Sequence, residues 1–282
     1  MRKITPILLF IFQFDVAWTQ SDTLIENKVY HLNRKIEIPI TLGLFAANYY
    51  GFQYIKNKPH LNTDQIATLN KNDVWKFDKS AVEQSYSPKT HQNAKKASDW
   101  GMNISIFLPA LLYLDKNIQK EGFNILLLYL ETQGINTSLY TYAGAMFTSR
   151  KRPFVYYPEE SLDRKLGIGT QDSFFSGHTS STATASFFMA KVYIDYHPEI
   201  KGKKWLLYIA ALIPPAFVGY FRYKSLMHFP SDIYIGIAAG AATGILVPHF
   251  HKVKLGKNQN ITIHPYTGRI MGLSVNFKFN ND

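Results

Sequence analysis

Two histidines, two arginines and an aspartate lie in three short clusters that could together bind and transfer a phosphate group. Arginine offers a planar fork of donors that suits phosphate oxygens, and histidine supplies a nucleophile, base or acid near neutral pH. The clusters are Arg152-Pro153, then Ser176-Gly177-His178, then Arg222, His228 and Asp232.

The third cluster places a histidine and a carboxylate four residues apart. His228 and Asp232 share one face if this segment is helical. A carboxylate on one imidazole nitrogen fixes the tautomer and leaves the other nitrogen free as a nucleophile or base. Arg222 precedes them with its phosphate-binding fork. Taken alone, the pattern also fits a surface histidine beside a capping aspartate.

The second cluster precedes a helix-like stretch. Ser176 is a natural N-cap, and Gly177 allows a backbone N–H to approach an anion closely. The positive end of the helix dipole attracts negative charge there. His178, in the first turn, could protonate a leaving oxygen. An ordinary serine-capped helix is the alternative.

The first cluster ends the basic run Ser149–Pro153. It predicts a phosphate clamp in which Pro153 fixes the chain where Arg152 turns toward the site. A solvated charge run at a membrane edge has the same composition. All three clusters together lack the carboxylate-rich ligand sphere of a magnesium or two-zinc phosphatase. Phosphoryl transfer to a histidine is therefore the predicted chemistry.

Six apolar segments predict an all-α bundle of six helices. Several are long enough to cross a bilayer, and the last is rich in Gly and Ala, which lets helices approach closely. Each cluster lies at a helix end, and the helix count puts all three on one side of a transmembrane bundle. The predicted helices are 36–55, 98–117, 122–147, 176–195, 204–222 and 230–250.

The two ends of the chain differ from this bundle. Residues 1–19 resemble a signal peptide, with Arg2 and Lys3 before an apolar run that is too short to span a bilayer. A buried N-terminal helix is the alternative. The helical domain is then 20–258. Alternating residues in 259–282 predict a short β-like tail.

The amino-acid composition limits the kinds of molecule that the protein is expected to bind. The 282 residues carry a formal charge of +11, which attracts phosphate-bearing molecules. Nucleic acid is not an expected partner, because no nucleic-acid-binding motif is found. The chain has no cysteine, so disulfides and thiolate chemistry are excluded. The mean hydropathy of −0.13 does not by itself indicate a membrane protein.

The clusters resemble the three signature motifs of the type-2 phosphatidic acid phosphatase superfamily, which also includes bacterial class A acid phosphatases and vanadium haloperoxidases. The resemblance implies that His228 is the nucleophile, that Asp232 orients and activates it, and that His178 is the general acid. It implies no metal and no cofactor. The phosphate-binding groups that it implies are Arg152, Arg222, Ser176 and Gly177.

The first motif departs from the family pattern. The family has a lysine seven residues before the arginine, where this chain has Ala145. Arg150 and Lys151 are the candidates to supply the missing charge. Phe175 and Phe221 replace the usual proline and serine of the other two motifs. The missing lysine also disfavours a haloperoxidase.

The resemblance therefore predicts a metal-independent phosphatase in the membrane of a bacterial cell envelope. The substrate would be a phosphatidate-like lipid, undecaprenyl diphosphate or a lipid A phosphate. The alternatives are a soluble periplasmic acid phosphatase for small phosphomonoesters and a catalytically weakened relative that binds phosphate or lipid. We expect the inner membrane and a site that faces the periplasm, although a cleaved signal peptide before six spans would place that site inside.

Overall fold

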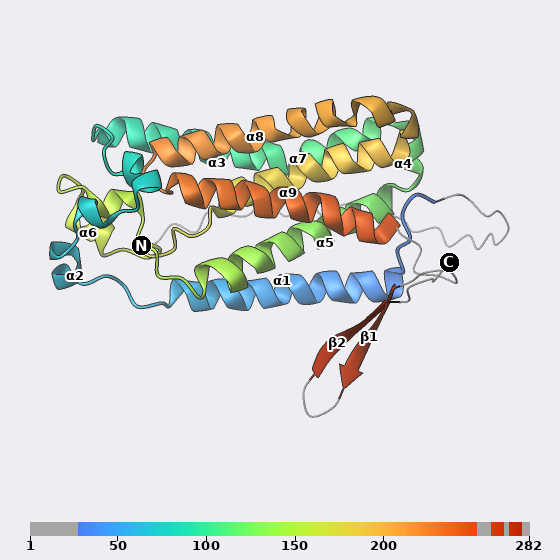
Figure 1. Cartoon of the computed structure of the whole chain (residues 1–282), viewed down its shortest axis with the longest axis horizontal. Coiled ribbons are helices and arrows are strands. Elements are labelled where there is room, and N and C mark those ends of the chain that lie inside the picture. Colours follow the sequence, from blue (N-terminus) through green and yellow to red (C-terminus); the bar gives the residue numbers. More distant parts are fainter. Residues whose placement is uncertain (1–27, 253–260, 268–270, 278–282) are drawn as a thin grey trace, which may run out of the picture.

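A bundle of long helices forms the body of the protein (Figure 1). The computed structural model describes residues 28–252, 261–267 and 271–277, so the predicted signal peptide, 1–19, lies outside the described residues. The predicted all-α bundle of six helices is confirmed. The long helices are α1 (Arg34–Lys56), α3 (Pro88–Ile106), α5 (Gly122–Ser138), α7 (Gly177–Tyr196), α8 (Lys204–Lys224) and α9 (Pro230–Lys252).

Shorter elements lie in the connections. The short α-helices are α2 (Thr63–Ala67), α4 (Lys116–Lys120) and α6 (Leu162–Lys165). The 3-10 helices are η1 (Lys71–Asp73), η2 (Lys76–Ala81), η3 (Leu108–Leu114), η5 (Pro153–Tyr156) and η6 (Pro198–Lys203). A π-helix, η4 (Leu139–Ala145), continues α5.

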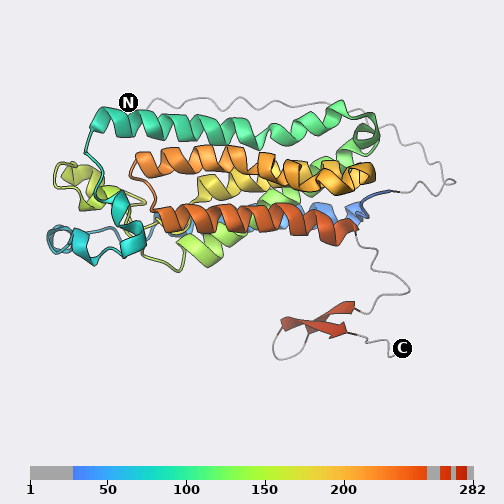
Figure 2. The same cartoon turned by 45° about the horizontal axis from the view of Figure 1, so that its top comes forward.

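Successive long helices alternate in direction, so the bundle has two distinct ends (Figures 1 and 2). The site end holds the connections 57–87, 146–176 and 225–229, which meet through contacts such as Phe154 N to Leu226 O at 3.1 Å. The far end holds 107–121 and 197–203. The start of α1 and the end of α9 also lie there, since His31 N donates to His251 O at 2.8 Å.

Four of the predicted helices match within two residues, and two do not. The segment 98–117 was expected to be one helix, but α3 begins at Pro88 and ends at Ile106. Proline is favoured in the first turn of a helix, as at Pro88, and Pro109 disfavours α-helical backbone in the residue before it, where the 3-10 helix η3 begins. The predicted helix 122–147 is instead α5 followed by the π-helix η4.

Helix α7 is the centre of the bundle and contacts α3, α5, α8 and α9. Glycines at every fourth position of α9 face its backbone. A Cβ atom on Gly240 would lie 2.1 Å from Ser180 O, and one on Gly236 would lie 2.7 Å from Ser176 O. Because these positions carry no side chain, the two helices approach backbone to backbone.

Helix α1 packs along α5 and its π-helical continuation through polar contacts. Asn48 Nδ2 donates to Gly134 O at 2.9 Å near the middle of the two helices. Lys58, just beyond α1, donates from Nζ to Ala145 O at 2.8 Å at the site end. Both donors therefore satisfy backbone carbonyls of the neighbouring helix.

The outside of the bundle is apolar and its centre is partly polar. Large apolar side chains on α1 and α8 are exposed, for example Ile40, Phe45, Ile209 and Ile213. The serines and threonines of α7 are mostly buried. Two helices, α8 and α9, are long and apolar enough to cross a membrane.

The C-terminal tail contains two antiparallel strands, β1 (Ile261–Thr267) and β2 (Met271–Phe277). Ile261 pairs with Phe277, and Thr267 pairs with Met271. The alternating pattern of the tail therefore predicted its strands correctly. The expected boundary between 258 and 259 lies outside the described residues.

The contact between α7 and α9 gives a test of the fold. Gly240→Ala should lower the free energy of unfolding by about 1–3 kcal/mol, because its methyl group must displace the Ser180 carbonyl. Gly43→Ala is the matched control, since nothing lies within 4 Å of a Cβ there. Thermal unfolding of the two purified variants measures the difference. Equal melting temperatures would contradict the close contact.

Candidate active site

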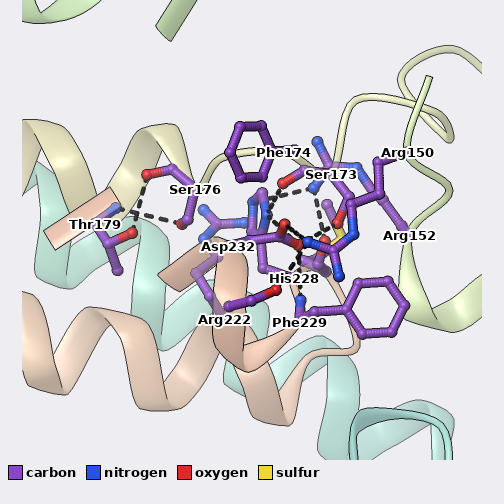
Figure 3. Close-up of polar contacts among 12 residues, drawn as sticks. Arg150, Arg152, Ser173, Phe174, Ser176, Thr179, Arg222, His228, Phe229 and Asp232 are labelled. Carbon is purple, nitrogen blue, oxygen red and sulfur yellow. Dashed lines mark hydrogen bonds and ion pairs between the residues drawn. The ribbon is translucent and has the colours of Figure 1, made fainter. Parts of the chain in front are cut away.

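His228 lies in the connection between α8 and α9 and is 3 % exposed (Figure 3). Its Nδ1 lies 2.7 Å from Ser173 O and donates to that carbonyl. Its Nε2 lies 3.0 Å from Arg152 Nη1, from which it accepts. The two contacts define one tautomer, with the proton on Nδ1 and the lone pair on Nε2. Nε2 is therefore the nitrogen available for nucleophilic attack.

The surroundings of His228 keep it uncharged. Burial lowers the pKa of the imidazole well below its ordinary value of 6.5, and the positive charges of Arg152 and Arg222 lower this pKa further. A neutral imidazole retains its lone pair, which a nucleophile requires.

Asp232 lies beside His228 without a hydrogen bond to it. The Oδ2 atom of Asp232 is 3.9 Å from His228 Nδ1. That oxygen accepts from Ser173 Oγ at 2.6 Å and from Phe229 N at 2.9 Å. Ser173 thus links the two residues: its hydroxyl binds Asp232 and its carbonyl binds His228. The residue that contacts the imidazole directly in the structure is Ser173, which the sequence analysis did not predict.

Arg152 enters the site from the connection after η4, in the extended residue that precedes η5. Its Nε donates to Gly169 O at 2.7 Å, and its Nη1 donates to Met227 O at 2.8 Å. Burial lowers the pKa of this guanidinium from its ordinary value, but an arginine remains charged. The carbonyls hold the charge in place next to His228 Nε2.

Arg222 and His178 meet at a carboxylate that the sequence reasoning missed. Arg222, 2 % exposed, donates from Nη2 to Asp99 Oδ1. His178 Nε2 lies 3.0 Å from the same oxygen. Arg222 Nε is buried and has no hydrogen-bond partner among the described residues, so it retains a free donor at the site.

Asp99 comes from α3 and its side chain is 42 % exposed. The site is therefore open to solvent on the side of His178, whereas it is closed around His228. The sequence contains a weak signal for Asp99, an acidic residue at the start of a segment predicted as apolar. Nothing in that signal indicates its two partners.

The start of α7 supplies the backbone of the site. Ser176 is the N-cap, as predicted, and its Oγ accepts from Thr179 N. A Cβ atom on Gly177 would lie 3.2 Å from the Tyr140 ring, so the glycine allows close packing. The first N–H groups of a helix have no partner within the helix and can bind an anion.

Arg150 and Lys151, the two candidates to replace the motif lysine, differ in their ion pairs. Arg150 forms ion pairs with Asp232 Oδ1 at 2.5 Å and with Asp78 Oδ2 at 2.6 Å. Its donors are thus directed at carboxylates and not at His228. Lys151 has no ion pair among the described residues.

A different lysine, Lys58, lies beside Ala145, the position where the family pattern has a lysine. Ala145 is fully buried, and its carbonyl accepts from Lys58 Nζ. The same ammonium donates to Thr148 O at 2.6 Å and to Asp172 Oδ1 at 2.8 Å. An ammonium has three donors, and these contacts use all three. Lys58 therefore braces the segment that follows η4, and it has no donor left for a phosphate.

Comparison of the chain with known protein families agrees with the three sequence clusters. Residues 121–255 match the model of the PAP2 superfamily, and this segment contains all three clusters. This segment, just under half of the chain, therefore belongs to the PAP2 superfamily, and the protein is a phosphatase.

No curated protein matches the chain. A solved structure that it resembles is described as the first transmembrane PAP2 type phosphatidylglycerolphosphate phosphatase from Bacillus subtilis, with 21% sequence identity and a TM-score of 0.43. The match covers 77% of this chain and 98% of that one.

The lowered pKa of His228 can be measured directly. Because its pKa lies well below 6.5, the imidazole should stay neutral as the pH falls through 6.5 and gain a proton only at lower pH. NMR of the protein with labelled histidine should show this, with the signal assigned through a His228→Gln variant. Arg152→Gln should raise the midpoint by removing a nearby positive charge. A wild-type midpoint at or above 6.5 would contradict the geometry.

Proposed function

We propose that this phosphatase hydrolyses a phosphomonoester or diphosphate of a lipid through a phosphohistidine on His228. The observation that carries the proposal is the pair of contacts on the imidazole. Ser173 O holds Nδ1, and Nε2 bears its lone pair beside the guanidinium of Arg152. A phosphate bound by that guanidinium would present its phosphorus to Nε2.

The first step forms a bond from Nε2 to phosphorus and breaks the bond from phosphorus to the leaving oxygen. The arginines Arg152 and Arg222 balance the charge on the transferred group. His178 gives its proton to the leaving alkoxide. Asp99, 3.0 Å from His178, is the counter-charge available to the protonated ring.

The second step returns the enzyme to its starting state. Water attacks the phosphohistidine, the bond from Nε2 to phosphorus breaks, and inorganic phosphate leaves. His178, now neutral, accepts the proton of that water. The backbone N–H groups at the start of α7 bind the phosphate oxygens through both steps.

A lipid substrate is supported by the outer surface of the bundle. Exposed large apolar side chains cover α1 and α8, and a contiguous apolar surface of this kind fits a membrane. The two helices with the length of a span, α8 and α9, flank the His228 connection. A headgroup at the site end would leave its chains beside these helices.

The membrane orientation is part of the same proposal. The connector 196–204 carries Lys201, Lys203 and Lys204 and joins α7 to α8 at the far end. Short basic loops are retained on the cytoplasmic side. This connector supports an inner-membrane protein whose site end faces the periplasm, against the lysines and arginines of the connections 57–87 and 146–176 at the site end itself.

The mechanism predicts that His228→Ala abolishes turnover. Phosphate release should fall by at least about a thousand-fold, the order of loss when a nucleophile is removed. His249→Ala is the control, since His249 is exposed on α9. The assay measures phosphate release from lipid monophosphates and diphosphates in detergent, with small phosphomonoesters as the comparison. Equal activity of the two variants would refute the nucleophile, and a preference for small esters would refute the lipid substrate.

The orientation can be tested because the chain has no cysteine. Glu159→Cys places a thiol in an exposed part of the site end, and Gly202→Cys places one at the far end. In bacterial spheroplasts, a membrane-impermeant maleimide should label the first variant, and it should label the second only after permeabilisation. The reverse pattern would show a site that faces the cytoplasm.

A further inference from the structure

Three side chains from separate helices converge in the part of the bundle toward the far end. Glu37 comes from the start of α1, Glu131 from the middle of α5 and His251 from the end of α9. One ligand atom from each lies within 4.8 Å of the others. His251 is about 29 Å along α9 from Asp232, from nineteen residues at about 1.5 Å each. This cluster is therefore separate from the phosphatase site.

The Nε2 atom of the histidine faces the two carboxylates. His251 Nδ1 lies 2.9 Å from Val247 O and donates to it. This contact leaves Nε2 as the acceptor nitrogen of the neutral ring, 3.4 Å from Glu131 Oε2 and 3.8 Å from Glu37 Oε1. A histidine that binds a metal ion commonly donates its other N–H to a carbonyl in this way.

Glu131 has a buried carboxylate oxygen that a bound cation would satisfy. The residue is 6 % exposed, and its Oε2 is buried without a hydrogen-bond partner. That oxygen lies 3.4 Å from His251 Nε2, and a buried carboxylate oxygen without a hydrogen bond is costly. Its position is explained if a ligand lies between the two atoms.

The charges of the cluster lead to the same conclusion. Among the described residues, the only ion-pair partner of either glutamate is His251. Two carboxylates and a protonated histidine would leave a net negative charge in the bundle. Two carboxylates, a neutral histidine and a divalent cation sum to zero.

The distances suit a small divalent ion. Two ligands about 2.1 Å from a tetrahedral zinc ion are about 3.4 Å apart. The separation of His251 Nε2 and Glu131 Oε2 has this value, and that of Nε2 and Glu37 Oε1 is slightly longer. Three protein ligands leave a fourth position for water.

We propose that Glu37, Glu131 and His251 form a binding site for a divalent metal ion that takes mixed nitrogen and oxygen ligands, with zinc as the probe. The ion joins α1, α5 and α9 and stabilises the bundle. It takes no part in the phosphatase chemistry at the site end.

A second histidine provides a matched control. His197 also lies between two carboxylates, but both ring nitrogens are already bonded. Its Nδ1 is 2.7 Å from Glu199 Oε1, and its Nε2 is 2.8 Å from Asp115 Oδ2. With both nitrogens in hydrogen bonds, no lone pair faces a shared position. His197 thus has the same residue types without the geometry of a metal site.

The test uses the purified full chain in detergent. The protein is treated with a chelator, reloaded with zinc and dialysed, and its bound zinc is measured by elemental analysis. We expect one zinc ion per chain. Glu131→Gln and His251→Gln should lower zinc occupancy at least about tenfold at the same free zinc, since each removes a ligand. His197→Gln should retain the ion.

Thermal unfolding gives a second readout of zinc binding, which depends neither on the yield of each variant nor on its phosphatase activity. Zinc should raise the melting temperature of the wild type and of His197→Gln, because a ligand that binds the folded state stabilises it. It should leave the melting temperatures of Glu131→Gln and His251→Gln unchanged. A wild type that takes up no zinc would show His251 to be a protonated partner of the glutamates. That result, or equal occupancy in Glu131→Gln and the wild type, overturns the proposal.

Discussion

The close contact between α7 and α9 is the constraint on which the site depends. Both helices begin at the site end, and Ser176 N donates to Asp232 O where they start. Glycines of α9 let its backbone reach the carbonyls of α7. The N-cap of one helix and the carboxylate of the other are thereby fixed against each other. A larger side chain in this interface would separate the start of α7 from His228.

Positive charge within the site is placed by backbone carbonyls and carboxylates. Arg152 is held by Gly169 O and Met227 O, while Arg150 is held by Asp78 and Asp232. The first arginine borders His228 and the second stabilises the carboxylate behind it. Two arginines within three positions of the chain therefore have different partners in the site. Burial beside such charges also keeps the imidazole of His228 neutral.

The sequence predicted the parts of the site that local patterns encode. The N-cap at Ser176 follows from residue type, and the ends of α8 and α9 follow from apolar length. Asp99, Ser173 and Lys58 were missed, because each acts through a partner more than fifty positions away. The start of α3 was also missed. Its first turns are polar, so apolar length gave too late a boundary, although Pro88 marks the start.

Helix α1 has contacts that fix how far it can move along its own axis. Its polar contacts lie at three heights: Glu37 with His251 of α9, Asn48 with Gly134 of α5, and Lys58 with Ala145 of η4. Where water is absent, a polar group that loses its partner finds no replacement. Sliding α1 by one turn would break all three contacts together. Polar contacts therefore fix the position of α1 along its axis. Helix α9 is instead fixed by the close approach to α7 that its glycines allow.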